Sequence, residues 1–206
     1  MSQQSRTKTG ILLALAVIAV SRLVSGSFFQ LSIAEFLLLV AIPTVYLKLA
    51  GRRLKDYGFT GGDVLQGLKY TVVIFMLATP FMLVGSTIES FRAYYPLWKP
   101  AYANINNFIL YELAVGVMLF STEFFYRGFL LFTLNKETKY GNLIQAFIYA
   151  LAHIGKPFLE VPYSFFAGLV FGSVDARCKS ILPSFLMHFL GNVAFDLMIL
   201  YFTGFS

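Results

Sequence analysis

The chain alternates between long apolar runs and short polar breaks. Several of the runs are close to the roughly 20 residues that a helix needs to cross about 30 Å of hydrocarbon. The fifth and sixth runs are short and rich in Gly and Ala, so we expect them to tilt little or to cross incompletely, shielded by other helices. The pattern predicts an all-α fold, a polytopic membrane helical bundle of about seven transmembrane helices. The predicted helices cover residues 9–28, 31–50, 64–85, 107–134, 141–156, 162–177 and 181–202.

Composition supports a membrane protein over a soluble one. The chain has 206 residues, of which 58% are hydrophobic and 13% are charged, which is too little polar surface for a soluble globule of this size. No linker, charge block or internal repeat divides the chain, so we predict a single integral membrane domain over residues 1–206. The net charge of +6 does not indicate a nucleic-acid partner, because the basic residues lie between apolar runs rather than on one solvated face.

The distribution of Lys and Arg predicts the orientation. Eleven of the 16 basic residues fall in or beside every second polar break, and these breaks all face the same side of the membrane. The positive-inside rule then places the N-terminus in the cytoplasm, and an odd number of spans places the C-terminus outside. We therefore expect a multi-pass protein of a prokaryotic plasma membrane. The eleven residues are Arg6, Lys8, Lys48, Arg52, Arg53, Lys55, Lys69, Lys136, Lys139, Arg177 and Lys179.

Two shorter features complete the outline. The segment 86–107 carries Tyr94, Tyr95 and Trp98 among prolines, which predicts an extracytoplasmic loop whose aromatic rings settle at the headgroup level. Cys178, the single cysteine, excludes an internal disulfide and lies between two basic residues, which indicates a surface loop in a reducing compartment.

Ionisable residues inside the apolar runs carry the candidate chemistry. A charged side chain at bilayer depth costs several kcal/mol unless it finds a partner inside the protein, which indicates an intramembrane active site. Glu123 and Arg127 are four residues apart, so on a helix they share a face and can pair. A purely structural ion pair that fixes helix packing is the alternative for these two residues.

The two histidines of the chain lie in two other predicted spans. At 1.5 Å per residue, Glu123, His153 and His188 lie roughly 16, 18 and 10 Å from the cytoplasmic ends of their helices, so three helices bring them to a similar depth. Two neutral imidazoles near a carboxylate can hold a water, stabilise an oxyanion or bind a metal. Asn192 follows His188 by one helical turn, so its amide faces the same side and can donate to developing negative charge.

These residues together resemble a known family. The order is Glu-x-x-x-Arg-Gly at Glu123, then an aromatic-x-x-x-His at Tyr149 to His153, then His-x-x-x-Asn at His188 to Asn192. This order is similar to that of the CPBP intramembrane proteases, which include CAAX prenyl proteases and bacteriocin-processing and immunity proteins. The resemblance places the protease-like core within residues 107–202. It implies a helical bundle around an internal polar cavity, in which a glutamate activates water to cleave a peptide bond.

The chain departs from the family at one position. The first motif usually has two adjacent glutamates, of which the first is the general base, and here that position is Thr122. Threonine cannot abstract a proton at neutral pH without a base of its own. Glu123 is the leading substitute, and Glu160 is the runner-up, because Gly155 and Pro157 end the fifth helix and the chain can fold back over the cavity. Glu112 is a weaker candidate, and Asp196 continues the stripe of His188 and Asn192 and can orient the amide.

We therefore expect an intramembrane endopeptidase that cleaves a membrane-associated or lipid-anchored peptide. In this hypothesis Glu123 activates water, His153 and His188 share proton transfer, Asn192 stabilises the oxyanion and Arg127 holds Glu123. The mechanism needs no cofactor, and zinc bound by His153, His188 and Glu123 is the alternative. The second hypothesis is a catalytically silent relative, a scaffold or immunity protein that binds a membrane partner. A third hypothesis is a small transporter or ion-conducting bundle that uses buried carboxylates as a relay; an inverted repeat would favour it, and the sequence shows none.

Overall fold

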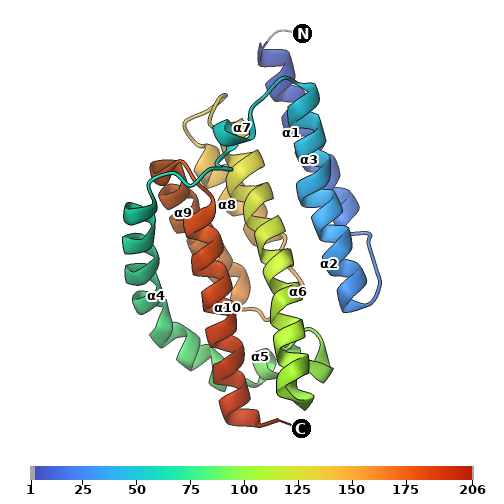
Figure 1. Cartoon of the computed structure of the whole chain (residues 1–206), viewed down its shortest axis with the longest axis vertical. Coiled ribbons are helices and arrows are strands. Elements are labelled where there is room, and N and C mark those ends of the chain that lie inside the picture. Colours follow the sequence, from blue (N-terminus) through green and yellow to red (C-terminus); the bar gives the residue numbers. More distant parts are fainter. Residues whose placement is uncertain (1–2, 206) are drawn as a thin grey trace.

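Helices account for all regular structure in the part of the chain that the computed structural model describes, residues 3–205. The N-terminus lies at one end of an elongated bundle and the C-terminus at the other (Figure 1). The α-helices are α1 (Gln3–Ser21), α2 (Phe28–Phe36), α3 (Ile42–Leu49), α4 (Val64–Thr87), α5 (Glu89–Tyr94), α6 (Ile105–Glu123), α7 (Leu131–Leu134), α8 (Gly141–Leu151), α9 (Glu160–Cys178) and α10 (Leu182–Thr203). Two π-helical segments, η1 (Leu37–Ala41) and η4 (Phe124–Leu130), and two 3-10 turns, η2 (Leu54–Tyr57) and η3 (Lys99–Ala103), complete the set.

The prediction of an all-α membrane bundle is confirmed. Among the described residues, 4 helical segments are long and apolar enough to cross a membrane, namely 28–49, 64–87, 105–134 and 182–203. Thr7–Ser21 and Gly141–Leu151 are shorter apolar helices. The number of spans, their orientation and the single-domain organisation stay predictions.

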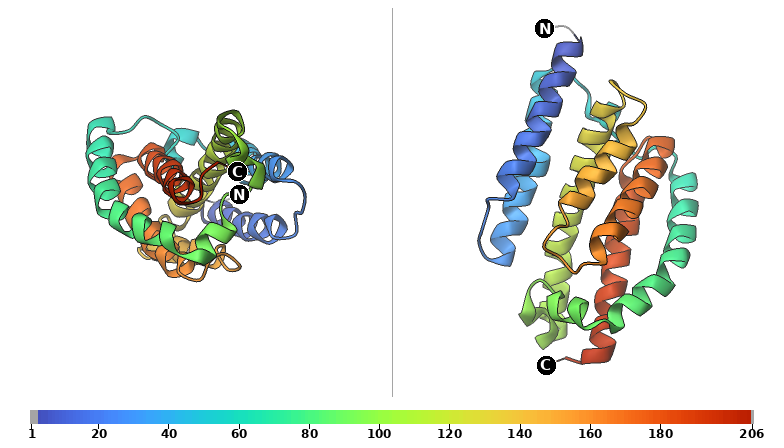
Figure 2. Two further views of the ribbon diagram at one scale, coloured as in Figure 1. Left: turned by 90° about the horizontal axis from the view of Figure 1, so that it is seen from below. Right: turned by 180° about the vertical axis from the view of Figure 1, so that it is seen from behind.

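The short fifth and sixth predicted helices form a hairpin, α8 and α9. Gly168 lets the two helices approach closely, because a Cβ atom there would lie 3.1 Å from the Cα of Ala146. Gln145 Nε2 donates to the carbonyl of Gly168 over 2.9 Å, which ties the helices together without a side chain from α9. Gly155 has φ +99°, a left-handed conformation that favours glycine in the turn between them. The turn ends near α5, whereas α6 and α10 continue beyond it (Figure 2).

Aromatic side chains of the segment between α4 and α6 pack against the bundle, and the position of this segment at the lipid headgroups stays a prediction. Tyr102 is only 6% exposed, and its hydroxyl donates to the carbonyl of Asp196 over 3.0 Å. The Trp98 ring packs edge-on against Phe29, with 5.2 Å between centroids. Buried carbonyl and carboxylate oxygens need donors, and the tyrosine hydroxyls of this loop supply them. The loop therefore covers one end of the bundle.

A π-helical segment follows Glu123 directly. All seven residues of η4 are buried, and η1, the second π-helical segment, packs against it. A π turn is rare and often occurs at functional sites, because the wider turn changes the direction of the side chains that follow. Gly128 in this segment is required by a close approach, since a Cβ atom there would lie 2.9 Å from the carbonyl oxygen of Tyr57.

The prediction that Cys178 lies in a surface loop is wrong. Cys178 is the last residue of α9 and is 2% exposed. Its carbonyl accepts from the backbone N–H of Asp63 over 3.1 Å, so the start of α4 covers it. The flanking basic residues signalled the end of the helix rather than the exposure of the thiol.

Candidate active site

Glu123 is the centre of a fully buried ionic group. Its Oε2 lies 3.1 Å from Arg127 Nε, and both side chains have 0% exposure. Its Oε1 accepts from His188 Nδ1 over 2.7 Å, because a carboxylate oxygen accepts and the ring nitrogen carries the proton. His188 is on α10, and its side chain is 24% exposed. Its other ring nitrogen, Nε2, does not take part in the contact with Glu123. The predicted Glu123–Arg127 pairing is confirmed, and the contact with His188 joins α6 to α10.

The guanidinium of Arg127 is held by charge and by aromatic rings rather than by hydrogen bonds. Its central carbon lies 3.9 Å from the ring centroid of Tyr149 and 5.6 Å from that of Phe171. None of its three nitrogens has a hydrogen-bond partner among the described residues. A cation over an aromatic face is stabilised by the ring quadrupole, more so where water is excluded. Glu123 and Tyr149 therefore provide the main compensation for a charge that is completely buried.

His153 and Glu160 form a second acid–imidazole group at the α8–α9 turn. The Nδ1 atom of His153 donates to the carbonyl of Tyr149 over 2.8 Å, since a carbonyl can only accept. In the neutral ring Nε2 is then an acceptor, and it lies 3.8 Å from Glu160 Oε1. Two acceptors that face each other need a donor between them, and a water that offers both of its protons satisfies this arrangement.

Two further donors hold the carboxylate of Glu160. Lys156 Nζ donates over 2.9 Å, and the hydroxyl of Tyr95 donates over 2.8 Å. Burial, and then the charge of Glu160, raise the pKa of Tyr95 well above its usual range, so this hydroxyl stays protonated and donates at physiological pH. The side chains of His153, Glu160 and Lys156 are 10%, 13% and 30% exposed, so this group is more accessible than Glu123.

Tyr149 lies between the two acid–imidazole groups. Its ring centroid is 4.4 Å from that of His153 and 6.5 Å from that of His188. The ring also lies beneath the guanidinium of Arg127. The two histidines are therefore neighbours across one aromatic ring, although each contacts a different glutamate.

Asn192 lies one turn beyond His188 on α10, as predicted, and faces two carboxylates. Its Nδ2 donates to Asp196 Oδ2 over 2.8 Å and to Glu112 Oε2 over 3.4 Å. Asp196 is fully buried and also accepts from the hydroxyl of Tyr102 over 3.3 Å. The first contact is short and the second is long, so Asp196 is the group that orients the amide.

The predicted site residues thus fall into three adjacent groups rather than one. Glu123 contacts Arg127 and His188, Glu160 contacts His153, and Asp196 contacts Asn192. An apolar groove of about 410 Å³ lies elsewhere, between α2 and α6, and the site residues do not line it. His153 and His188 contact different glutamates, because the α8–α9 turn provides a carboxylate of its own for His153.

Several contact residues were not predicted. Lys156 was detectable in principle, because it precedes Glu160 by four residues. Tyr95 is 65 positions from Glu160, and no local pattern links them. Asp175, a fully buried charge in an apolar run, accepts from the backbone N–H of Ser184 over 3.1 Å and from its hydroxyl. A lone acid in such a run is itself the signal that would have found Asp175.

The alternative zinc set does not fit the geometry. Within residues 3–205, no group of three or more His, Cys, Asp or Glu side chains is arranged to hold a metal ion. His153, His188 and Glu123 divide between two groups, since His153 faces Glu160 instead. A catalytic zinc needs three converging protein ligands.

Comparison with known proteins supports the resemblance that the motifs indicate. Residues 104–194 match the family model of the Rce1-like type II CAAX prenyl endopeptidases. The search of curated proteins and that of solved structures found no match. The matched segment begins at the N-terminus of α6 and ends within α10, so it contains the Glu123 and Glu160 groups and Asn192, whereas Asp196 lies two residues beyond it.

Proposed function

We propose that the chain is an intramembrane endopeptidase, because the match of residues 104–194 to the Rce1-like endopeptidase model supports its recognition as a CPBP-type protease. Its substrate is a membrane-associated or lipid-anchored peptide segment, and lipid surrounds the bundle. The reaction is hydrolysis of one peptide bond by an activated water.

The contact between His153 Nε2 and Glu160 Oε1 carries this proposal. These two acceptors are 3.8 Å apart, in a partly exposed turn, with the protonated nitrogen of the ring fixed by the carbonyl of Tyr149. A water bound between them is oriented with its lone pair outward and can attack the carbonyl carbon of the substrate. Its proton passes to the imidazole or the carboxylate. In this scheme Glu160 takes the role that the residue at position 122 has in the family.

Glu123 has a different role in this scheme. One of its oxygens faces Arg127 and the other is bonded to His188, so both are engaged. A carboxylate that accepts from Nδ1 orients the ring and stabilises the imidazolium that forms when Nε2 takes a proton. Nε2 of His188 takes the second proton of the attacking water from the hydroxyl of the tetrahedral intermediate and delivers it to the leaving amine, while the first proton stays on His153 or Glu160 until it is released to solvent.

Asn192 is the proposed donor to the oxyanion. The short bond to Asp196 holds the amide, while the long bond to Glu112 can be exchanged for a bond to the developing negative charge. Asp196 is then a positioning residue.

Cleavage of reporter peptides in proteoliposomes tests the proposal. Wild type is compared with Glu160→Gln and Glu123→Gln, each checked for an unchanged elution volume and melting temperature. We expect Glu160→Gln to lower kcat by about 10²–10⁴-fold, the usual contribution of a general base. Full activity of Glu160→Gln together with loss of activity in Glu123→Gln would show that Glu123, and not Glu160, is the general base. Inhibition by a chelator that zinc reverses would support metal catalysis instead.

A catalytically silent scaffold or immunity protein is the second candidate, and Thr122 favours it. If wild type cleaves no peptide of a diverse library in any lipid, while still capturing a lipidated peptide, the second candidate replaces the first.

A further inference from the structure

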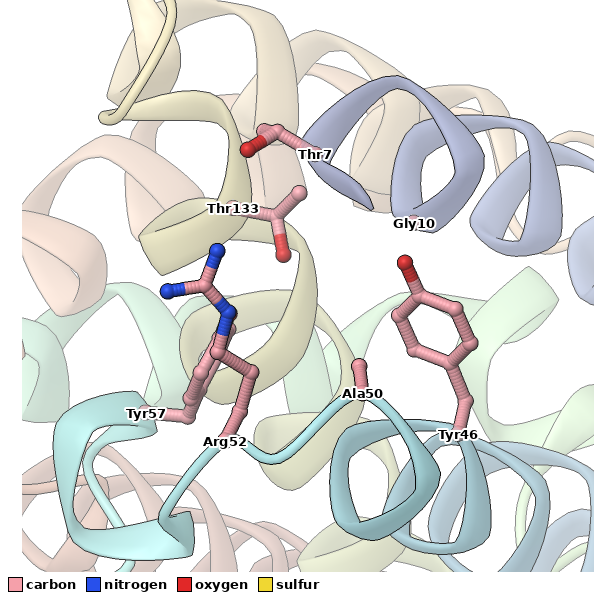
Figure 3. A pocket seen from close by; sticks show the side chains of 7 residues that line it. All are labelled: Thr7, Gly10, Tyr46, Ala50, Arg52, Tyr57 and Thr133. Atoms are coloured by element: carbon pink, nitrogen blue, oxygen red, sulfur yellow. The ribbon is translucent and has the colours of Figure 1, made fainter. Parts of the chain in front are cut away.

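A small pocket lies at the basic end of the bundle, away from the proposed active site. It forms where α1, the turn after α3 and α7 meet (Figure 3). Its volume is about 10 Å³, which is the space of a single oxygen-sized group. The lining residues are Thr7, Gly10, Tyr46, Ala50, Arg52, Tyr57 and Thr133.

Donor groups from three elements point into this pocket. The guanidinium of Arg52 and the hydroxyls of Tyr46 and Thr133 face the same space (Figure 3). Thr133 is 3% exposed, and its Oγ1 makes no hydrogen bond of good geometry among the described residues, although the hydroxyl of Tyr57 lies beside it. A buried hydroxyl without a partner is costly, and guanidinium groups can only donate. The group that fits here is therefore an oxygen acceptor with negative charge.

The charges around the pocket favour an anion as well. Arg53 is paired with Asp56, whose carboxylate accepts two bonds of 3.0 Å, whereas no described ion pair involves Arg52. The amine of Lys136 lies 3.9 Å from the ring centroid of Tyr57, which lines the pocket. Burial, and then the charge of Arg52, lower the pKa of Lys136. Arg52 and Lys136 are thus held close together, while the carboxylate of Asp56 is already paired with Arg53.

We propose that this pocket binds the phosphate group of an anionic membrane lipid. It lies where α3 ends at Leu49 and α7 ends at Leu134, both apolar helix ends, which is the level of lipid headgroups. One phosphate oxygen enters the pocket and accepts from Thr133, and the others accept from the planar fork of Arg52. The bound phosphate joins α1, α3 and α7 at one point.

Binding of phosphatidic acid to the purified chain in neutral detergent tests this site. Diacylglycerol with the same acyl chains lacks the phosphate and is the lipid control. We expect phosphatidic acid to bind at one per chain, and Arg52→Gln to raise its Kd at least about tenfold through loss of a charge-assisted contact. Thr133→Val should weaken binding by a smaller factor. The matched control is Arg53→Gln, which removes the same charge one residue away and should leave the Kd within about twofold.

Three results would overturn the site as proposed. Equal weakening by Arg52→Gln and Arg53→Gln would mean diffuse attraction to basic residues. Equal binding of phosphatidic acid and diacylglycerol would mean that the acyl chains alone are recognised. Binding of inorganic phosphate that depends on Arg52, without binding of phosphatidic acid, would assign the site to soluble phosphate. Melting temperatures of the variants within the range of wild type confirm that each one is folded.

Discussion

The two acid–imidazole groups of this bundle differ in burial and in how fully their atoms are engaged. The Glu123 group lies inside the long helices, with the carboxylate and its arginine at 0% exposure. The Glu160 group lies at the α8–α9 turn, where the side chains of His153 and Glu160 are 10% and 13% exposed. In the first group the imidazole donates to the carboxylate, whereas in the second the imidazole and the carboxylate present acceptors to each other.

This difference separates the group on which stability should depend most from the group that is proposed to bind the reacting water. Breaking a fully buried ion pair leaves a charge without compensation, so the first group should matter for stability. A partly exposed pair of acceptors contributes little to stability, yet it can bind and orient water. Stability should therefore respond most to substitutions in the Glu123 group, whereas substitutions in the Glu160 group should lower activity with little change in stability.

The largest expected effect on stability comes from Arg127→Met. This change leaves Glu123 buried without its cation and should lower the free energy of unfolding by about 3–5 kcal/mol. Thermal unfolding in detergent, followed by circular dichroism, measures it. The control is Arg53→Met, which removes an exposed guanidinium and should shift the melting temperature much less. Equal shifts in the two variants would remove the basis for calling the Glu123 group structural.

Gly128→Ala should have the next largest effect. The added Cβ atom would lie 2.9 Å from the carbonyl oxygen of Tyr57, so the turn that contains η2 must move. We expect a loss of about 1–3 kcal/mol, typical of overpacking at a rigid site. Gly191→Ala is the control on α10, because its Cβ atom would meet only the sulfur of Met82 at 3.9 Å. A Gly128→Ala variant with the same free energy of unfolding as wild type would show that the turn containing η2 can move at little cost.

Glu160→Gln should change the free energy of unfolding by about 1 kcal/mol, the usual net contribution of one hydrogen bond. The amide keeps the shape of the side chain and can still accept from Tyr95 and Lys156. The same unfolding measurement applies. A loss as large as that of Arg127→Met would make the two groups equivalent and would contradict the division of tasks.

The smallest expected effect is that of Tyr95→Phe. Removing this hydroxyl takes one of the two protein donors from Glu160 and leaves Lys156 in place. We expect cleavage to slow by about 3- to 10-fold, consistent with a net hydrogen-bond contribution near 1 kcal/mol. Tyr94→Phe is the neighbouring control, because no described hydrogen bond joins its hydroxyl to the carboxylate. Equal cleavage rates in wild type and Tyr95→Phe would mean that the segment between α4 and α6 has no role in the reaction.

The parts of the fold and site that were predicted depend on local spacing. Glu123 and Arg127 pair because they are four residues apart, and Asn192 follows His188 by one helical turn for the same reason. The contact between Tyr95 and Glu160 depends on how a distant loop packs against the α8–α9 turn, and no periodicity encodes it. The π-helical segment after Glu123 was also not predicted, because it packs against η1 and approaches Tyr57, and no local spacing encodes these contacts between distant segments.

The kinetics of a double-substitution cycle at His153 and Glu160 test most directly whether these two residues activate the water together. Cleavage rates are measured for wild type, His153→Gln, Glu160→Gln and the double variant under the same conditions. If the two side chains act as one unit, the double variant should be about as slow as the slower single variant. Rate losses that multiply in the double variant would mean that the two residues act independently, and would contradict the proposed mechanism.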